Sequence, residues 1–412
     1  MSRVNSKSSK ANLGIKSDGI SLDKQDEEFL KWLSPSQWLV ESQLAYFRKE
    51  RKEDTLKWAP VTPEFQAWMK SDLRHDSRDR LLWISGPLGI GKSIMWAYFI
   101  DILKKLYPNS IVAYFFCRSG QKGLTTAQDI LRTISYQCIQ GDDDARSFLE
   151  DLHKKAFKIE ELFGLRFLTQ RLITEPVHQS AREVFIVLDG LDEADLEIPD
   201  VAARVKPHPE IHVLLQQLAC TPRSRLLIVS RPNPIVKDAL PEIVRRPVGQ
   251  RENWKDIETY VNETISKSRT LKASFAKINT DPLDYFDKHA KGIFLWVVLV
   301  LKQLEAAETV SIFRRHVETF SNASGDMNVL YSNILSKYST ENRNWLTEIL
   351  TWLVAANEDV TLRLVKEAVE WFLGDERLQF DEFVKVDCGT LLHLISITES
   401  EMRIELVHET RF

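Results

Sequence analysis

The stretch LLWISGPLGIGKSIMWAYF, which runs from Leu81 to Phe99, decides the fold. Its first five residues form a short apolar run bounded by a glycine, which predicts a buried strand. Residues 86–93 then fit the pattern G-x-x-x-x-G-K-[ST], and a helical pattern continues to Leu106. A strand, a glycine-rich loop and a helix in this order predict a phosphate-binding P-loop.

Each part of this loop has a physical role at a phosphate. Gly89 and Gly91 permit backbone conformations and a close phosphate approach that a Cβ atom would hinder. The start of the helix supplies free N–H donors and about half a positive charge. We expect Lys92 to reach the β- and γ-phosphates and the Ser93 hydroxyl to bind Mg²⁺. The predicted nucleotide-binding loop comprises Gly86, Pro87, Leu88, Gly89, Ile90, Gly91, Lys92 and Ser93.

A P-loop needs an acidic partner for its metal ion, and the segment VFIVLDGLDEAD at 184–195 supplies one. Asp189 directly follows an apolar run, where an unpaired carboxylate is costly to bury and therefore indicates a metal ligand. Asp192 and Glu193 come next, and either can orient or deprotonate an attacking water, with Glu193 preferred. The alternative for this second pair is an exposed acidic turn.

A further apolar run, RLLIVS at 225–230, ends in Arg231. An arginine at a strand end beside a phosphate site can report whether a γ-phosphate is present. The alternative is a surface arginine in a turn, and the sequence alone leaves both open.

The order of elements predicts an α/β fold with a parallel sheet covered by helices, because apolar strands alternate with helical segments. After about Pro247 the strand signal largely vanishes and helical patterns follow one another. A last helix and two short strands then resemble a winged helix. The expected strands are 81–85, 110–116, 184–189, 225–230, 391–396 and 403–408; the expected helices include 93–106, 126–140, 254–266, 282–290, 293–307, 310–320, 328–337, 341–355 and 363–373.

These patterns divide the chain into five parts. They are a disordered tail at 1–24, an N-terminal helical segment at 25–78, a P-loop NTPase core at 79–246, a helical lid domain at 247–325 and a winged-helix-like domain at 326–412.

Bulk composition excludes several classes of protein. The formal net charge of −4 gives no electrostatic reason to expect a nucleic-acid partner. The N-terminus has no apolar signal region. The longest apolar run, Ile293–Leu301, is shorter than the ~20 residues that cross a bilayer. The four cysteines are scattered and suggest neither a zinc site nor disulfides. We therefore expect a cytoplasmic protein without a membrane span.

Several motifs together resemble the NACHT-type P-loop NTPases of the STAND class, in particular those of filamentous fungi. They are LLWISGPLGIGKS, AYFF at 113–116, LDGLDE at 188–193 and IVSRP at 228–232, with GIFLWVVLV at 292–300, LYSNIL at 330–335 and ELVHETRF at 405–412 further on. The second acidic pair in LDGLDE discriminates this class from ordinary kinases. The P-loop domain also resembles the nephrocystin-3-like N-terminal domain.

The resemblance implies an ATP/ADP-dependent signal-transduction switch that hydrolyses ATP slowly with Mg²⁺, in fungal self/non-self recognition or cell-death signalling. The ADP form is closed, and the ATP form opens, forms a homo-oligomer and engages a protein effector whose identity is unknown. His408 stands at the position of the family's winged-helix histidine, which is thought to touch the ADP phosphate. The alternative for His408 is a structural role.

The chain departs from the family at a few positions. Leu88 stands where the family usually has proline, and Asp54 and Leu56 stand where it often has glycine, so upstream contacts to adenine are not carried over. Family members usually continue into a repeat-built sensor. The chain stops at Phe412, which leaves open a truncated form, a fragment of a larger repeat-containing protein or a sensorless member.

Two other functions remain open on the residues alone. A P-loop kinase or motor needs an acceptor pocket or a ring-forming arginine finger, and neither is recognisable in the sequence. A nucleotide-binding scaffold with little or no hydrolysis needs only the loop and its metal partner.

Overall fold

The protein is described here from a computed structural model. The described residues are 33–34, 36–73, 78–119, 121–140, 143, 145–147, 149–150, 165–179, 182–194, 209–336, 338–356, 360–388, 391–396 and 402–406. The expected tail at 1–24 and His408 lie outside them.

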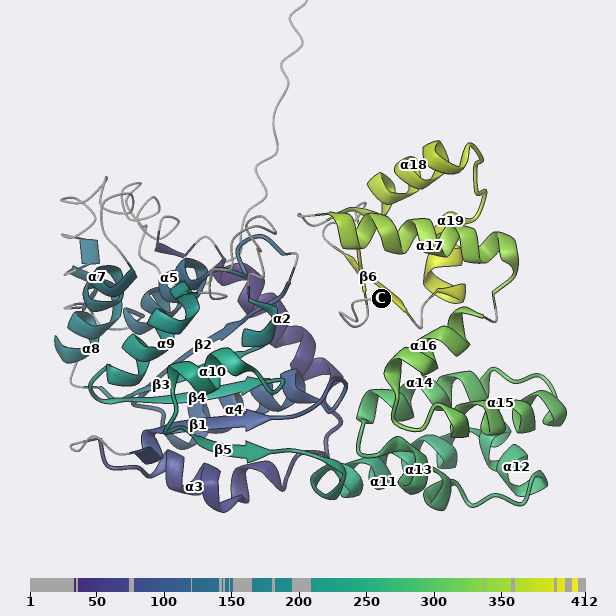
Figure 1. The fold of residues 1–412 in the computed structure, drawn as a ribbon, viewed down its shortest axis with the longest axis horizontal. Helices are drawn as coiled ribbons and strands as arrows, with labels where there is room; N and C mark the ends of the chain where they lie inside the picture. Colours follow the sequence, from purple (N-terminus) through teal and green to yellow (C-terminus); the bar gives the residue numbers. More distant parts are fainter. Residues whose placement is uncertain are drawn as a thin grey trace, which may run out of the picture.

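A five-stranded parallel sheet forms the first part of the molecule (Figure 1). Its order is β2-β3-β4-β1-β5, and every neighbouring pair is parallel. The four strands expected from apolar runs are confirmed. The strands are β1 (Leu81–Ser85), β2 (Ile111–Phe116), β3 (Val184–Asp189), β4 (Ser224–Ser230) and β5 (Val244–Pro247).

The fifth strand was not expected. β5 carries Arg245 and Arg246 at its centre, and its residues alternate between half-buried and exposed. Such a strand at the edge of a sheet has no continuous apolar run to reveal it. Its main-chain pairing with β1 places the segment that follows it, beginning at Val248, beside the P-loop.

The strand order places helices on both faces of the sheet. The step from β1 through α4 to β2 runs in the opposite direction to the steps from β2 through α5 to β3 and from β3 through α9 to β4. Because such crossovers are right-handed, α4 covers one face and α5 and α9 cover the other (Figure 1). The helical segments of this part are α2 (Gln37–Glu50), η1 (Ala59–Val61), α3 (Pro63–Met69), η2 (Arg78–Arg80), α4 (Lys92–Leu106), α5 (Ala127–Cys138), α7 (Leu165–Thr169), η3 (Gln170–Thr174), α8 (Glu175–Gln179), η4 (Leu191–Glu193), α9 (Pro209–Cys220) and α10 (Pro234–Ala239).

The rest of the chain is mostly helical and has its own apolar core, which extends from Ile257 to Ile404. The expected helices are confirmed to within a few residues at their ends, and α12 is an addition. A two-stranded antiparallel sheet follows α17, α18 and the short α19 (Figure 1). The elements are α11 (Gln250–Lys267), α12 (Arg269–Lys277), α13 (Pro282–Ala290), α14 (Phe294–Glu305), α15 (Val310–Asn322), α16 (Met327–Leu335), α17 (Thr340–Ala355), α18 (Leu362–Leu373), α19 (Phe380–Glu382), η5 (Phe383–Asp387), β6 (Leu392–Ser396) and β7 (Met402–Leu406).

No helix among the described residues combines the length and apolarity needed to cross a membrane.

Candidate functional site

Three strand ends meet at one edge of the sheet. β4 lies between β1, which leads into the P-loop, and β3, which ends in Asp189. The Gly86 N–H donates to Ser230 O at 3.3 Å, and the Gly190 N–H donates to Val229 O at 3.0 Å. Because the carboxyl ends of parallel strands share one edge, the loops after these three strands form a common site, the usual place for ligands in such sheets.

The P-loop has the backbone that its glycines predict. Gly89 has φ +74° and Gly91 has φ +98°, both in the region that side chains disfavour, and α4 begins at Lys92. No atom lies within 4 Å of the place where a Cβ atom on Gly91 would stand, so the space beside that residue is open. The Lys92 Nζ donates to Pro87 O at 2.9 Å, across the loop. Burial lowers the pKa of Lys92, while the carboxylates of Asp189 and Asp192 oppose that change.

Asp189 is the most unusual group of the site. Its side chain is 1% exposed, and neither of its carboxylate oxygens has a hydrogen-bond partner among the described residues. Burial raises its pKa from 3.8 to about 7, although the nearby Ser93 and Lys92 act in the opposite direction. A buried carboxylate without a partner is costly, and a bound cation offsets that cost. Mg²⁺ prefers oxygen ligands, so Asp189 and Ser93 fit the metal position that the sequence predicts.

Arg231, Asp192 and Glu193 form an ion-pair cluster at the ends of β4 and β3. The Asp192 carboxylate accepts from the Arg231 N–H at 3.0 Å and also from the Arg231 Nε. The Glu193 carboxylate lies 3.7 Å from the Arg231 guanidinium. Asp192 therefore binds Arg231 through both its backbone N–H and its side chain, whereas Glu193 forms a longer ion pair with the Arg231 guanidinium. The role of Asp192 in activating water stays a prediction, and so does the role of Arg231 as a γ-phosphate sensor.

The helical part of the chain contacts the P-loop directly, which the sequence did not reveal. The buried Asn253 of α11 donates from Nδ2 to Ile90 O at 2.7 Å, and the Leu295 N–H at the start of α14 donates to Gly89 O at 3.0 Å. Leu88 packs against the apolar core of the helical part. The departure from proline at position 88 thus places an apolar side chain against that core.

The segment before the P-loop joins the same helix. Asp256 of α11 accepts from the Leu56 N–H and from the Trp58 Nε1, both at 3.0 Å. Leu56 is buried and has φ +66°, a conformation in which glycine is at ease, so the family's frequent glycine at this position has a structural reason. Asp256 and the two N–H donors form a second connection between α11 and the first part of the chain.

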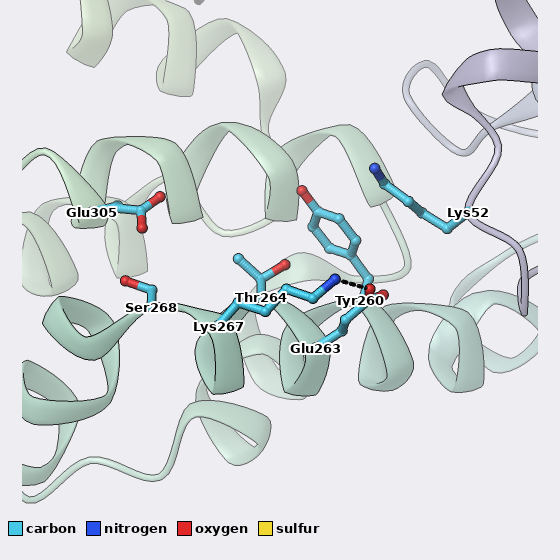
Figure 2. Close-up of a pocket in the computed structure, with 7 residues that line it drawn as sticks. All are labelled: Lys52, Tyr260, Glu263, Thr264, Lys267, Ser268 and Glu305. Carbon is cyan, nitrogen blue, oxygen red and sulfur yellow. Dashed lines mark hydrogen bonds and ion pairs between the residues drawn. The ribbon is translucent and has the colours of Figure 1, made fainter.

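A separate pocket lies further along α11 and is outside the phosphate site. Figure 2 shows it between Lys52, the last turns of α11 and Glu305 of α14, with a volume of about 280 Å³. Tyr260 forms its wall and packs against Phe294, and the ring centroids are 5.1 Å apart. Its lining is polar and of both charge signs, and no P-loop residue belongs to it.

The structure therefore brings together the predicted residues of the P-loop, Asp189, the acidic pair and Arg231. His408 lies outside the described residues, and its role stays a prediction. The sequence missed Asn253 and the contacts of α14. α11 buries Asn253 together with Asp256, Ile257 and Val261, and a polar residue on the buried side of a helix does not by itself identify its partner.

Comparisons with known proteins agree with this geometry. Residues 54–231 match the family model "Nephrocystin 3, N-terminal". The vegetative incompatibility protein HET-E-1 of Podospora anserina is 26% identical over 377 residues, which are 87% of this chain and 26% of that protein. The chain thus spans about a quarter of the length of the curated relative it matches.

Two solved structures are similar at lower sequence identity. The Walker-type ATPase PABY2304 of Pyrococcus abyssi is 12% identical, with a TM-score of 0.38, and covers 87% of this chain and 95% of its own. The Cdc6p of Pyrobaculum aerophilum is 14% identical, with a TM-score of 0.32, and covers 79% and 83%. The P-loop, the parallel sheet and the match to the nephrocystin 3 N-terminal family and to HET-E-1 make the chain a NACHT-type P-loop NTPase.

Proposed function

We propose that the chain is a signalling switch driven by ATP and ADP, in which slow hydrolysis resets the state. The observation that supports this most directly is the pairing of Arg231 with Asp192 and Glu193. Arg231 directly follows β4, which lies between the P-loop strand and the Asp189 strand. A γ-phosphate competes with these two carboxylates for the guanidinium, because all three are anionic acceptors. ATP and ADP then favour different arrangements of the same three side chains.

Each remaining residue of the site has a part in this proposal. The P-loop backbone and Lys92 hold the phosphates, while Ser93 and Asp189 hold Mg²⁺, which neutralises phosphate charge when bound. Glu193 orients or deprotonates the attacking water. Asp192 holds Arg231, and through it the end of β4. His408 contacts the ADP phosphate in the closed state.

The energy that such a switch requires is modest. A ligand shifts a two-state equilibrium from 1:99 to 99:1 if it prefers one state by about 5.5 kcal/mol. One or two charge-assisted hydrogen bonds, at about 1.5–3 kcal/mol each, together with a contact made only to ADP, reach that order. The proposed sensor Arg231 and the proposed ADP contact at His408 provide differences of this kind.

The similarity to HET-E-1 supports a proposal about the biological process in which the chain acts. HET-E-1 is named a vegetative incompatibility protein, and we propose that this chain acts in self/non-self recognition or cell-death signalling of the same kind. We further propose that the ATP form assembles into a homo-oligomer that engages a protein effector. An alternative is a nucleotide-binding scaffold with little hydrolysis. Asp192 is engaged by Arg231, so of the acidic pair only Glu193 is proposed to activate water, and the two functions differ at that residue.

Replacing Glu193 with glutamine separates the two functions. If Glu193 activates water, phosphate release from Mg²⁺-ATP falls about 100-fold, at the lower end of what general-base catalysis contributes. ATP affinity stays within about twofold, since the amide keeps the size of the side chain. Phosphate release is measured under single-turnover conditions, with Glu308→Gln on the exposed surface as the control. If wild type and Glu193→Gln both release no detectable phosphate while binding ATP, the scaffold is correct and the slow ATPase is wrong.

A further inference from the structure

The outer side of the P-loop is held by hydrogen-bond donors from the helical part of the chain. The Leu295 N–H donates to Gly89 O at 3.0 Å. The Asn253 Nδ2 donates to Ile90 O at 2.7 Å and also to Gly292 O at 3.1 Å, so one amide group ties the loop to the turn before α14. Two successive carbonyl groups of the loop thus point toward the helical part.

The direction of these two carbonyl groups also sets the direction of the N–H groups on the opposite side of the loop. The described peptide bonds are trans, and in a planar trans peptide the C=O and the next N–H point in opposite directions. A donor on Gly89 O therefore fixes the direction of the Ile90 N–H, and a donor on Ile90 O fixes that of the Gly91 N–H. Both N–H groups are therefore directed away from the helical part. A Cβ atom on Gly91 would also meet no atom within 4 Å, so the loop is not crowded at that residue.

The contact is too close to be incidental. A Cβ atom on Gly89 would stand 2.9 Å from both Ile293 Cγ2 and Leu295 Cβ, so only glycine fits there. Asn253 is 1% exposed, and its Oδ1 has no hydrogen-bond partner among the described residues. Its two donated hydrogen bonds are therefore what offsets the burial of its amide.

We infer that Asn253 is a positioning residue that couples docking of the helical part to the phosphate site: it holds Ile90 O so that the Gly91 N–H is aimed at a bound phosphate. This inference rests on the proposed nucleotide function. Coupling is reciprocal, so a diphosphate group that uses this N–H also favours the docked helical part. ADP is expected to stabilise the docked state through the loop itself, without touching Asn253.

The test compares two variants of α11 with a ligand that lacks a base. Asn253→Leu removes the donor to the P-loop. Asp256→Leu is the matched control, because it removes the other connection of α11 to the first part of the chain, at Leu56 and Trp58, and leaves the loop carbonyls alone. Calorimetry measures the binding of inorganic pyrophosphate and of ADP, each with Mg²⁺, to wild type and both variants, after circular dichroism has shown that they fold.

We expect Asn253→Leu to weaken the binding of both ligands about tenfold, which corresponds to about 1.4 kcal/mol. Asp256→Leu loosens a docking contact of α11 but leaves both donors to the P-loop carbonyls in place, so we expect it to weaken pyrophosphate binding by no more than about twofold. Asn253→Asp, which keeps the size and replaces the donor by an acceptor, weakens pyrophosphate binding at least as much and replaces Asn253→Leu if that variant does not fold. Equal losses in Asn253→Leu and Asp256→Leu, or no loss in either Asn253 variant, overturn the inference.

The same experiment separates this inference from the proposed function. If wild type binds neither pyrophosphate nor ADP, the nucleotide function itself is wrong. If wild type binds both ligands and the Asn253 variants bind them equally well, only the positioning role is wrong.

Discussion

Replacing Lys92 with alanine lowers the affinity for Mg²⁺-ATP and for ADP at least 100-fold, or about 2.7 kcal/mol. Lys92 is the cation at the start of α4 and lies near the carboxylates of Asp189 and Asp192. Its Nζ donates a hydrogen bond to Pro87 O across the loop. A half-buried cation that contacts phosphate oxygens makes charge-assisted hydrogen bonds, and alanine supplies none. Fluorescent nucleotide titration measures the loss.

Lys105→Ala is the matched control for this prediction. Lys105 lies in the last turn of the same helix, is exposed, and carries the same charge. Its replacement removes the same unit of net charge and leaves nucleotide affinity unchanged. Equal binding by wild type and Lys92→Ala would show that residues 86–93 are a strand–helix turn without a phosphate function.

Replacing Asp189 with asparagine stabilises the nucleotide-free protein and abolishes its response to Mg²⁺. The pKa of Asp189 is raised to about 7 in the folded chain, against 3.8 for an ordinary aspartate. The folded state therefore binds the proton more tightly than the unfolded state does, and stability falls as pH rises between these two values. From about pH 5 to pH 8 we expect the free energy of unfolding of the wild type to fall by on the order of 3 kcal/mol relative to that of Asp189→Asn.

Urea unfolding of the nucleotide-free proteins at the two pH values measures this difference. Asp238→Asn, on the exposed surface of α10, is the control and follows the wild type. With saturating Mg²⁺ and ADP we expect the wild type to become more stable than Asp189→Asn. The cation binds the carboxylate of the wild type, and the variant has no carboxylate at this position. Asp189 is not a metal ligand if the wild type and Asp189→Asn show the same pH dependence of the free energy of unfolding and gain the same stability from Mg²⁺-ADP.

The parallel sheet and the composition of the phosphate site were predictable because their signals are local. A strand that is buried on both faces is a continuous apolar run, and Asp189 and Arg231 each directly follow such a run. Parallel strands then bring these ends to one edge whatever their separation in sequence.

The rest depends on contacts that no local pattern records. β5 pairs with β1 through its main chain although its centre is Arg245-Arg246. Asn253 reaches Ile90 O across 163 positions of sequence, and a lone asparagine in a helix does not identify its acceptor. The engagement of Asp192 by Arg231 likewise appears only when β3 and β4 are placed side by side.

Nucleotide binding at residues 86–93 with Asp189 underlies every role proposed for the chain, and the nucleotide content of the purified protein tests it most directly. Mass spectrometry of the released small molecules is expected to find ADP stoichiometric with the wild-type chain and none with Lys92→Ala. A wild type that carries no nucleotide, and that binds neither ADP nor ATP when they are added with Mg²⁺, would contradict the account.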